Sequence, residues 1–172
     1  MMVAQEAGGI AGKLAELADP WSKLFAHSKV VSAGVLFLHL VPLVVAAGAA
    51  FAADRATLRA SRGAVGDRTR QLQELATIHT VVLGGLALSF VSGVLLFLSD
   101  VETFFGSIFL WVKLTLVFLL LVNGFLMTRT EKALGGSGED AALWGRLRTL
   151  AYLSAFLWLA TTLAGVVLKE YA

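Results

Sequence analysis

Four long apolar stretches divide the sequence, and shorter polar stretches separate them. They lie near residues 30–53, 76–98, 108–128 and 149–168. Each has about the 20 residues that a helix needs to cross the ~30 Å hydrocarbon core of a bilayer. Helix is the expected conformation, because a backbone surrounded by lipid must satisfy its own hydrogen-bonding groups. The pattern predicts an all-α integral membrane protein whose residues 30–172 form a four-helix bundle.

The segment before the first span, residues 1–29, follows a different pattern. Over residues 3–18, apolar residues recur at helical spacing and charged residues occupy another face: Ile10, Leu14 and Leu17 against Glu6, Lys13 and Glu16. Asp19 and Pro20 predict the end of this helix, because proline disfavours helical backbone at the residue before it. We expect a short amphipathic helix that lies on the membrane interface, with a frayed tail as the alternative. Residues 1–9 lack the charged start and apolar core of a signal peptide, so the segment is expected to be retained.

Composition and charge support the membrane assignment and indicate an orientation. Of the 172 residues, 58% are hydrophobic and 15% are charged, which is too little charge to cover a soluble domain. Basic residues concentrate in loops 54–75 and 129–148, whereas loop 99–107 carries only acidic charges. The positive-inside rule therefore places the two basic loops in the cytoplasm and both termini outside. Because the basic residues flank apolar spans, they indicate topology and not nucleic-acid binding.

Several kinds of chemistry lack the residues that they need. The chain has no cysteine, which excludes disulfides, thiolate metal sites and covalently attached haem. The four apolar stretches contain no Asp or Glu, the residues that proton-coupled pumps usually carry inside the membrane. The sequence has no recognisable nucleophile–base pair. We therefore assign no catalytic residue and no metal site, and a non-enzymatic role is favoured.

Small residues inside the spans predict where the helices pack. Lipid offers little hydrophobic drive for helix association, so positions that permit close backbone approach form the contacts. These positions are residues 46–50 in the first span, Gly85, Ser89 and Gly93 in the second, and Thr161, Thr162 and Gly165 in the fourth. Pro42 is expected to kink the first span, because it cannot donate a hydrogen bond to the carbonyl of Leu38.

Three ionisable side chains lie inside the spans, where burying a charge is costly and usually functional: His39, His79 and Lys113. From the helical rise, His39 lies ~13 Å below the outer surface. A polar cluster is expected around it, because three hydroxyl residues fall near the same level: Ser89, Thr161 and Thr162. His79 lies only ~5 Å from the cytoplasmic side, where Asn123 is within reach of a hydrogen bond.

Imidazole is the usual axial ligand of haem when no thiolate is present, so His39 and His79 are candidate ligands of a b-type haem. Their predicted depths differ by ~10 Å, so joint ligation of one iron needs helix tilt or a partner chain. The alternative is that each histidine is neutral and hydrogen-bonded to a nearby hydroxyl or carbonyl. Lys113 lies ~7 Å inside the outer surface and is expected to extend its ammonium toward water. Otherwise it would contact a haem propionate or an anionic headgroup.

Three segments carry a resemblance to known proteins: FLHLVPLVVAAGAAFAADR, SGVLLFLSD and FLWVKLTLVFLLLVNGFL. They resemble small bacterial four-helix membrane proteins of the copper-resistance D type and of the membrane protoporphyrinogen oxidase family, including relatives with no assigned function. Such proteins place a histidine in the first span, here His39, and a W-x-K-L motif at the start of a later one, here Trp111-Val112-Lys113-Leu114. The resemblance covers residues 30–130 and implies a location in the bacterial inner membrane. The oxidase family would imply haem binding and porphyrin oxidation, but it carries a histidine late in the W-x-K-L span, where this chain has Asn123.

These observations lead to three functional hypotheses. The first is a non-catalytic accessory subunit that packs against other membrane subunits or a second copy of itself, because the third span is rich in large apolar residues. The second is a haem b protein for electron transfer or haem chemistry, through His39 with or without His79. The third is transport of a metal or a small solute.

Overall fold

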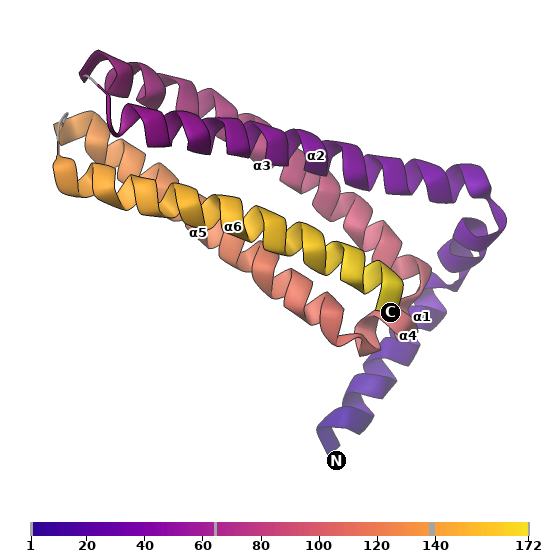
Figure 1. Ribbon diagram of the computed structural model, residues 1–172. Coiled ribbons are helices and arrows are strands. Elements are labelled where there is room, and N and C mark those ends of the chain that lie inside the picture. The colour runs from indigo at the N-terminus through magenta and orange to yellow at the C-terminus, as the bar shows by residue number, and fades with distance from the viewer. Residues whose placement is uncertain (1, 64, 138–139, 172) are drawn as a thin grey trace.

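The computed structural model describes residues 2–63, 65–137 and 140–171, and within these ranges it contains six helices and no strand (Figure 1). The helices are α1 (Met2–His27), α2 (Lys29–Ala60), α3 (Val65–Ser99), α4 (Val101–Gly106), α5 (Ile108–Ser137) and α6 (Ala141–Tyr171). Four of them, α2, α3, α5 and α6, are long and apolar enough to cross a membrane. The all-α class and the four spans are therefore confirmed.

Each long helix extends past the apolar stretch that predicted it. α2 continues to Ala60 and α5 to Ser137, so the basic loops expected at 54–75 and 129–148 are short turns between helices. Hydropathy marks only the part of a helix that lies in lipid, whereas helical hydrogen bonding continues wherever no residue interrupts it. The loop expected at 99–107 also contains a helix, the short α4, whose N-cap Asp100 accepts from the backbone N–H of Thr103 at 3.3 Å.

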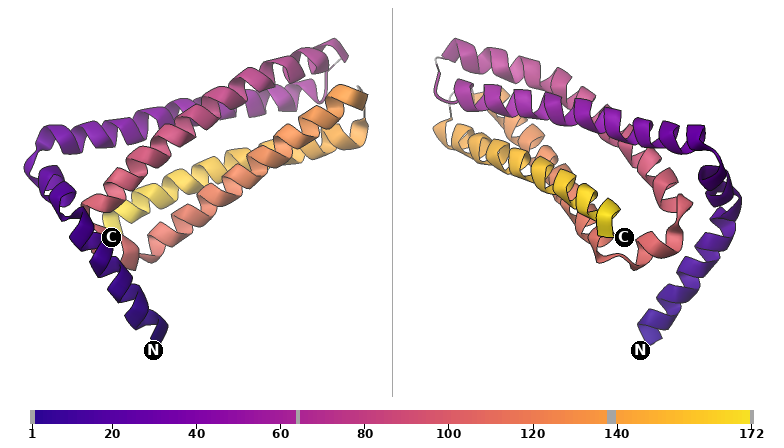
Figure 2. Two further views of the ribbon diagram at one scale, coloured as in Figure 1. Left: turned by 180° about the vertical axis from the view of Figure 1, so that it is seen from behind. Right: turned by 45° about the vertical axis from the view of Figure 1, so that its right-hand side comes forward.

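The four long helices form two antiparallel hairpins. α2 packs along α3, α5 packs along α6, and the hairpins meet chiefly through α2 and α6. Figures 1 and 2 show that the helices lie close together at the end where the α2–α3 and α5–α6 turns are, and spread toward the end that carries α1 and α4. Below, these ends are termed the arginine-rich end and the α4 end.

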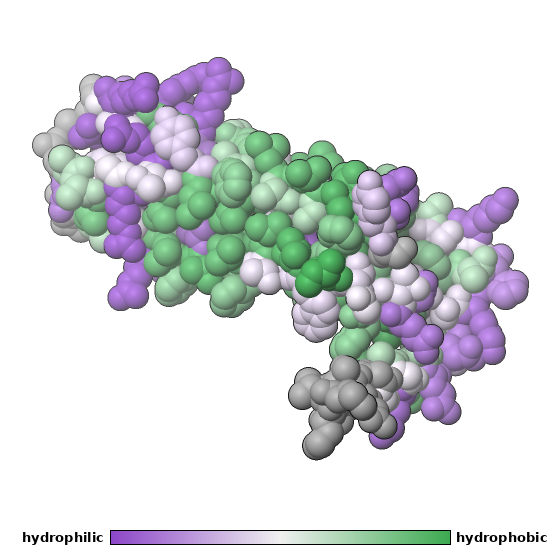
Figure 3. Space-filling model, turned by 60° about the horizontal axis from the view of Figure 1, so that its bottom comes forward, coloured by the Kyte–Doolittle hydropathy of each residue, from purple (hydrophilic) through white to green (hydrophobic). Residues whose placement is uncertain are grey.

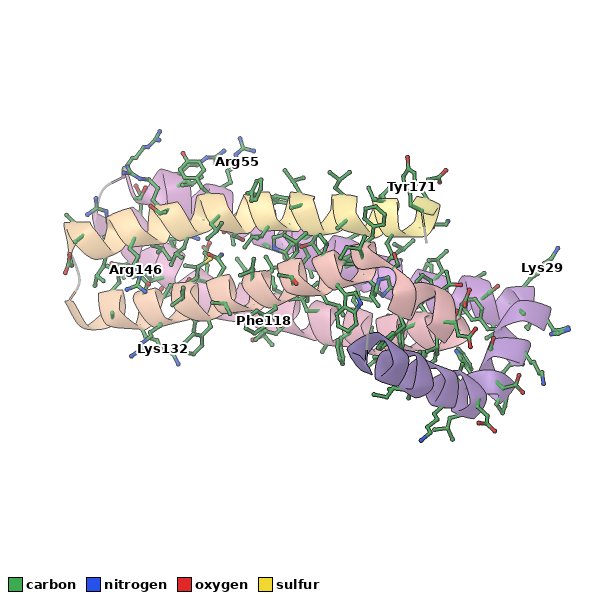
Figure 4. The ribbon with its side chains drawn as sticks, turned by 90° about the horizontal axis from the view of Figure 1, so that it is seen from below. Lys29, Arg55, Phe118, Lys132, Arg146 and Tyr171 are labelled. Carbon is green, nitrogen blue, oxygen red and sulfur yellow. The ribbon has the colours of Figure 1, made fainter. Side chains whose placement is uncertain are left out.

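The outer surface of the long helices is apolar along the middle and polar at both ends. Figure 3 shows a broad hydrophobic band between two hydrophilic regions. The exposed Phe118 lies midway along α5, whereas Arg55, Lys132 and Arg146 lie together at the arginine-rich end (Figure 4). A bilayer requires this distribution, because lipid tails contact apolar side chains and charged groups must reach water.

α1 is longer than predicted. It continues through Pro20 to His27 instead of ending before the proline. Trp21 and Ser22 donate side-chain hydrogen bonds to two carbonyls of α3, those of Leu95 and Ser99, both at 2.8 Å. These tertiary bonds hold the second half of α1 in place, although the proline removes one hydrogen bond from the helix.

The face of α1 that packs on the rest of the protein also differs from the predicted one. Ala11 and Ala18 are buried, whereas Leu17 of the predicted apolar stripe is 80% exposed and Ile10 is 55% exposed. Small alanines allow α1 to approach α3 and α4 closely, which larger side chains would prevent. The exposed Ile10 and Leu17 remain available to a membrane interface.

Small residues bring α2 and α3 together, as predicted. A Cβ atom at Gly85 would lie 2.7 Å from the carbonyl oxygen of Pro42 and 2.8 Å from Cβ of Ala46. Ala46 is fully buried in this contact. In α6, the neighbouring Thr161 and Thr162 separate: Thr161 is buried, and Thr162 is exposed. The expected interior position of Thr162 is therefore wrong, because consecutive residues point about 100° apart around a helix.

Candidate functional site

His39 lies on α2 toward the α4 end, and residues of α3 hold its ring. Its Nδ1 is 2.9 Å from the carbonyl oxygen of Ser89 and 3.3 Å from Oγ of Ser92. Ser89 Oγ in turn donates to the carbonyl of His39 at 2.9 Å. The bond to the Ser89 carbonyl needs a proton on Nδ1, which leaves Nε2 as the free nitrogen of a neutral ring. The expected proximity of His39 and Ser89 is thus present.

Ser92 supplies a hydrogen-bond donor to the carbonyl that Pro42 leaves without one. The carbonyl of Leu38 loses its intrahelical donor to the proline ring, and Ser92 Oγ lies 3.2 Å from that carbonyl. The same hydroxyl lies 2.9 Å from the carbonyl of Leu88 in its own helix. Its single proton is therefore shared between the kink in α2 and the backbone of α3.

Lys113 points toward α6. Its side chain is half-buried, and a Cβ atom at Gly165 would lie 3.5 Å from its Nζ. The ion pairs found among the described residues do not include Lys113. Thr161 is buried one turn away on α6, and its hydroxyl has no hydrogen-bond partner in the described part of the chain. The extension of Lys113 toward water stays a prediction.

A second polar cluster lies among the four long helices toward the arginine-rich end. It is termed the acid cluster and consists of Asp54 of α2, His79 of α3, Glu131 of α5 and Ser154 of α6. His79 Nδ1 lies 3.4 Å from Oε2 of Glu131. The hydroxyl of Ser154 lies near the Asp54 carboxylate, and the charges of Asp54 and Glu131 are close enough to interact. All four membrane-crossing helices thus contribute one side chain to this cluster.

The two carboxylates are enclosed and incompletely paired. Asp54 is 4% exposed, and the side chain of Glu131 is 10% exposed. Asp54 Oδ2 and Glu131 Oε1 are buried and have no hydrogen-bond partner among the described residues. Two like charges in an apolar interior repel each other and lose hydration, so the state in which both are ionised is costly. Binding a proton relieves both costs.

Polar side chains connect the acid cluster to the arginine-rich end. Gln71 Nε2 donates to Oγ1 of Thr57 at 3.2 Å, and Thr57 lies three residues after Asp54 on the same face of α2. Gln71 also lines a surface cavity of about 330 Å³ between α2 and α3, together with Arg59, Asp67, Arg70 and Glu74. Gln71 and Thr57 therefore lie between this cavity and Asp54.

An apolar layer separates the acid cluster from the α4 end. It contains Ala46 and Ala50 of α2, Leu120 of α5, and Leu157 and Trp158 of α6, all buried. On each of these helices the layer lies between the polar residues of the two ends. Among the described residues, Gln71 and Thr57 thus lie on the arginine-rich side of Asp54, and the apolar layer lies on its other side.

Asp54 and Glu131 lie in the segments expected to be loops, although the spacing of interior residues contains a signal for both. The small residues Ala46 and Ala50 are followed at helical spacing by Asp54, and Asn123 is followed in the same way by Met127 and Glu131. Extending the interior stripe past the last apolar residue would have identified both acids.

Asn123 does not make the hydrogen bond expected of it, and the two histidines lie far apart along the helices. Asn123 donates to the carbonyl of Leu150 at 3.2 Å and not to His79. Ser89, which contacts His39, lies ten residues from His79 along α3, which is about 15 Å of helix. The two histidines therefore do not meet at one level. Among the described residues, no three His, Asp or Glu side chains are grouped as they would be around a metal ion.

Comparisons of the chain with protein-family models, with curated proteins and with solved structures found no match.

Proposed function

We propose that this chain is an accessory subunit of a larger membrane assembly, and that it binds a proton in the acid cluster. In this proposal the four long helices cross the membrane as one bundle, with the arginine-rich end in the cytoplasm. The observation that carries the proposal is the pair of buried carboxylates, Asp54 and Glu131, each with an oxygen that lacks a partner in the described structure. Ionisable groups inside a membrane protein are costly and usually mark proton or ion sites.

The chemistry required is the transfer of one proton between oxygen and nitrogen atoms. A proton taken up by the Asp54–Glu131 pair removes one of the two negative charges and with it their mutual repulsion. His79 can accept this proton from Glu131, because its Nδ1 lies 3.4 Å from Oε2 and a small side-chain movement closes a hydrogen bond. The hydroxyl of Ser154 lies near the Asp54 carboxylate and favours its charged form.

The residues around the acid cluster favour proton access from one end of the bundle. Gln71 and Thr57 provide a polar approach from the arginine-rich end, whereas the layer of Leu120, Leu157 and Trp158 closes the other side. A complete transporter needs access from both sides of the membrane in turn. A subunit that exchanges protons with one side, and passes the effect to a partner, needs only the arrangement present here.

Infrared titration of the protein in lipid nanodiscs tests proton binding directly. We expect a protonated-carboxyl C=O band near neutral pH that disappears in Glu131→Gln and in Asp54→Asn. The control is Glu102→Gln, because Glu102 is exposed on α4 and should not change the band. If the wild type lacks the band, or if the control abolishes it, the proton-binding proposal is wrong.

Proteoliposomes containing this chain alone test the accessory role. With a membrane potential imposed and a pH-sensitive dye inside, we expect no sustained proton flux above that of empty vesicles. In gently solubilised producing membranes, the chain should migrate on a native gel at a size well above that of one copy. A monomer with its own steady proton flux would contradict the accessory role and favour a transporter.

One observation favours haem b as a second candidate function, with His39 as a single axial ligand. Histidines that bind a metal usually donate their other ring N–H to a carbonyl, and His39 Nδ1 makes that bond to Ser89. Its Nε2 would then be the nitrogen available to iron. The test is the ultraviolet–visible spectrum of protein purified from its native membrane: a haem band should vanish in His39→Ala and persist in His27→Ala, which changes an exposed histidine. A colourless wild type would remove this candidate.

A further inference from the structure

Lys113 is a cation in an apolar place without a counter-charge in the described structure. It is half-buried between α5 and α6, with its Nζ against Gly165. The titratable neighbour whose electrostatic interaction with it is resolved is His39, which cannot supply a negative charge. A charge removed from water is costly unless an opposite charge or hydrogen bonds compensate it. A bound anion would therefore offset the cost of placing the ammonium here.

Thr161 offers a second donor on α6, one helical turn from the point where the ammonium lies. It lies four residues before Gly165, so both lie on the same face of α6. Thr161 is 4% exposed, and its hydroxyl is buried without a hydrogen-bond partner among the described residues. The absence of a side chain at Gly165 leaves the backbone of α6 accessible to the Lys113 ammonium at this point. A hydroxyl and an ammonium on one helix–helix seam are suited to an oxyanion.

The depth of Lys113 indicates how an anion would reach it. Lys113 lies five residues after Ile108, the first residue of α5, which corresponds to about 7 Å along the helix. Apolar groups that rest at a membrane interface reach about 5–10 Å into the boundary between headgroups and acyl chains. Lys113 thus lies close enough to the α4 end for its long side chain to reach a headgroup phosphate, and the helices spread at this end (Figure 2).

We propose that Lys113 and Thr161 form a binding site for a phosphate group, which an anionic phospholipid or free inorganic phosphate supplies. The ammonium of Lys113 and the hydroxyl of Thr161 donate to its oxygens. This site shares no residue with the acid cluster and lies beyond the apolar layer, so it is independent of the proposed proton binding.

Thermal unfolding of the full chain in neutral detergent tests the site. Phosphatidylglycerol and inorganic phosphate are titrated in separate series, and phosphatidylcholine serves as the uncharged-lipid control. We expect one of the two phosphate sources to raise the unfolding temperature of the wild type at lower concentrations than phosphatidylcholine. Lys113→Met should raise about tenfold the additive concentration that gives half of this stabilisation, and Lys113→Arg should leave that concentration nearly unchanged. Thr161→Val should raise the same concentration by a smaller factor.

Lys169→Met is the matched control, because Lys169 is exposed near the same end of α6. Stabilisation by phosphatidylglycerol alone supports the site with a lipid as the source, and stabilisation by phosphate alone supports it with the free anion. Equal effects of all three additives, or equal losses in Lys113→Met and Lys169→Met, would overturn the proposal. Lys113→Met is expected to fold, because it replaces a buried charge with an apolar side chain of similar length.

Discussion

Asp54 and Arg55 are neighbours in sequence but lie in opposite environments. Arg55 is exposed at the arginine-rich end, whereas Asp54 is enclosed by α3, α5 and α6 (Figure 4). The cause is the rotation of about 100° between consecutive helical residues, which turns one side chain outward and the next inward. At the scale of the residue, helical phase therefore matters more than local charge for deciding which charged side chain faces the interior.

Gly85 and Gly84 offer a sharp test of close packing at single residues. Gly85→Ala should destabilise the protein by about 1–3 kcal/mol, because the new Cβ would lie 2.7 Å from the carbonyl oxygen of Pro42 and must push α2 away. Gly84→Ala should be neutral or stabilising by up to about 1 kcal/mol, because no atom lies within 4 Å of its new Cβ and alanine favours helix. Thermal unfolding in one detergent measures both. Equal effects of the two substitutions would show that α2 and α3 do not approach at Gly85.

At the scale of the element, tertiary contacts decide where helices end. Pro20 predicted the end of the first helix, yet α1 continues to His27 with Trp21 and Ser22 bonded to α3. The local preference against helix before proline is modest, and two hydrogen bonds to another element can outweigh it. The same principle extends α2 and α5 past their apolar stretches, where the interior contacts of Asp54 and Glu131 continue the helical pattern.

The anchoring of α1 can be measured through Trp21. Trp21→Phe removes the hydrogen bond from the indole N–H to the Leu95 carbonyl and keeps most of the ring, so α1 should detach about five- to tenfold more often. Hydrogen exchange over residues 9–27 reports this as faster exchange. Trp111→Phe is the control, since its indole bonds to Phe105 within the neighbouring turn and not to α1. Unchanged exchange in Trp21→Phe would mean that α1 is held by other contacts.

At the scale of the whole molecule, two hairpins share one apolar band. α2 and α6 join the hairpins, and the interior alternates between polar and apolar layers along the helices. The acid cluster lies on the arginine-rich side of the apolar layer of Leu120 and Trp158, where Gln71 and Thr57 provide a polar approach and Leu134 and Trp144 belong to a second apolar cluster. A polar group in such a position is stabilised only by its partners, so changes in protonation should alter how the hairpins fit together.

The orientation of the molecule remains a prediction that cysteine labelling can check. The chain has no cysteine, so single cysteines can be introduced without a background. Glu102→Cys lies on α4 and Arg62→Cys in the α2–α3 turn, and both positions are exposed. In intact producing cells, a membrane-impermeant maleimide should label Glu102→Cys, and Arg62→Cys only after the membrane is broken. The reverse pattern would place the arginine-rich end outside and move the proposed proton approach to that side.

The phase of the small residues could be deduced from the sequence for the α2–α3 contact, because Gly85, Ser89 and Gly93 repeat every four residues. The predicted phase was wrong for Thr162. Thr161 and Thr162 are adjacent and similar, so only the packing of α6 determines which of them is buried. The sequence predicted that Ser89 lies near His39. It did not predict Ser92, because the role of Ser92 depends on the kink that Pro42 makes in α2. The acid cluster was not anticipated, since hydropathy ended the spans before Asp54 and Glu131.

The sequence by itself determined the helical class, the four membrane-crossing helices and the polarity of their ends. A bilayer imposes these features on any chain, since about 20 apolar residues span it and charges must reach water. Only the tertiary structure decided which polar side chains come near one another: His79 contacts Glu131, Asp54 lies within electrostatic range of Glu131, and Lys113 lies beside α6. These meetings depend on the rotation and tilt of whole helices. Rotation and tilt result from many small packing differences that no single stretch of sequence contains.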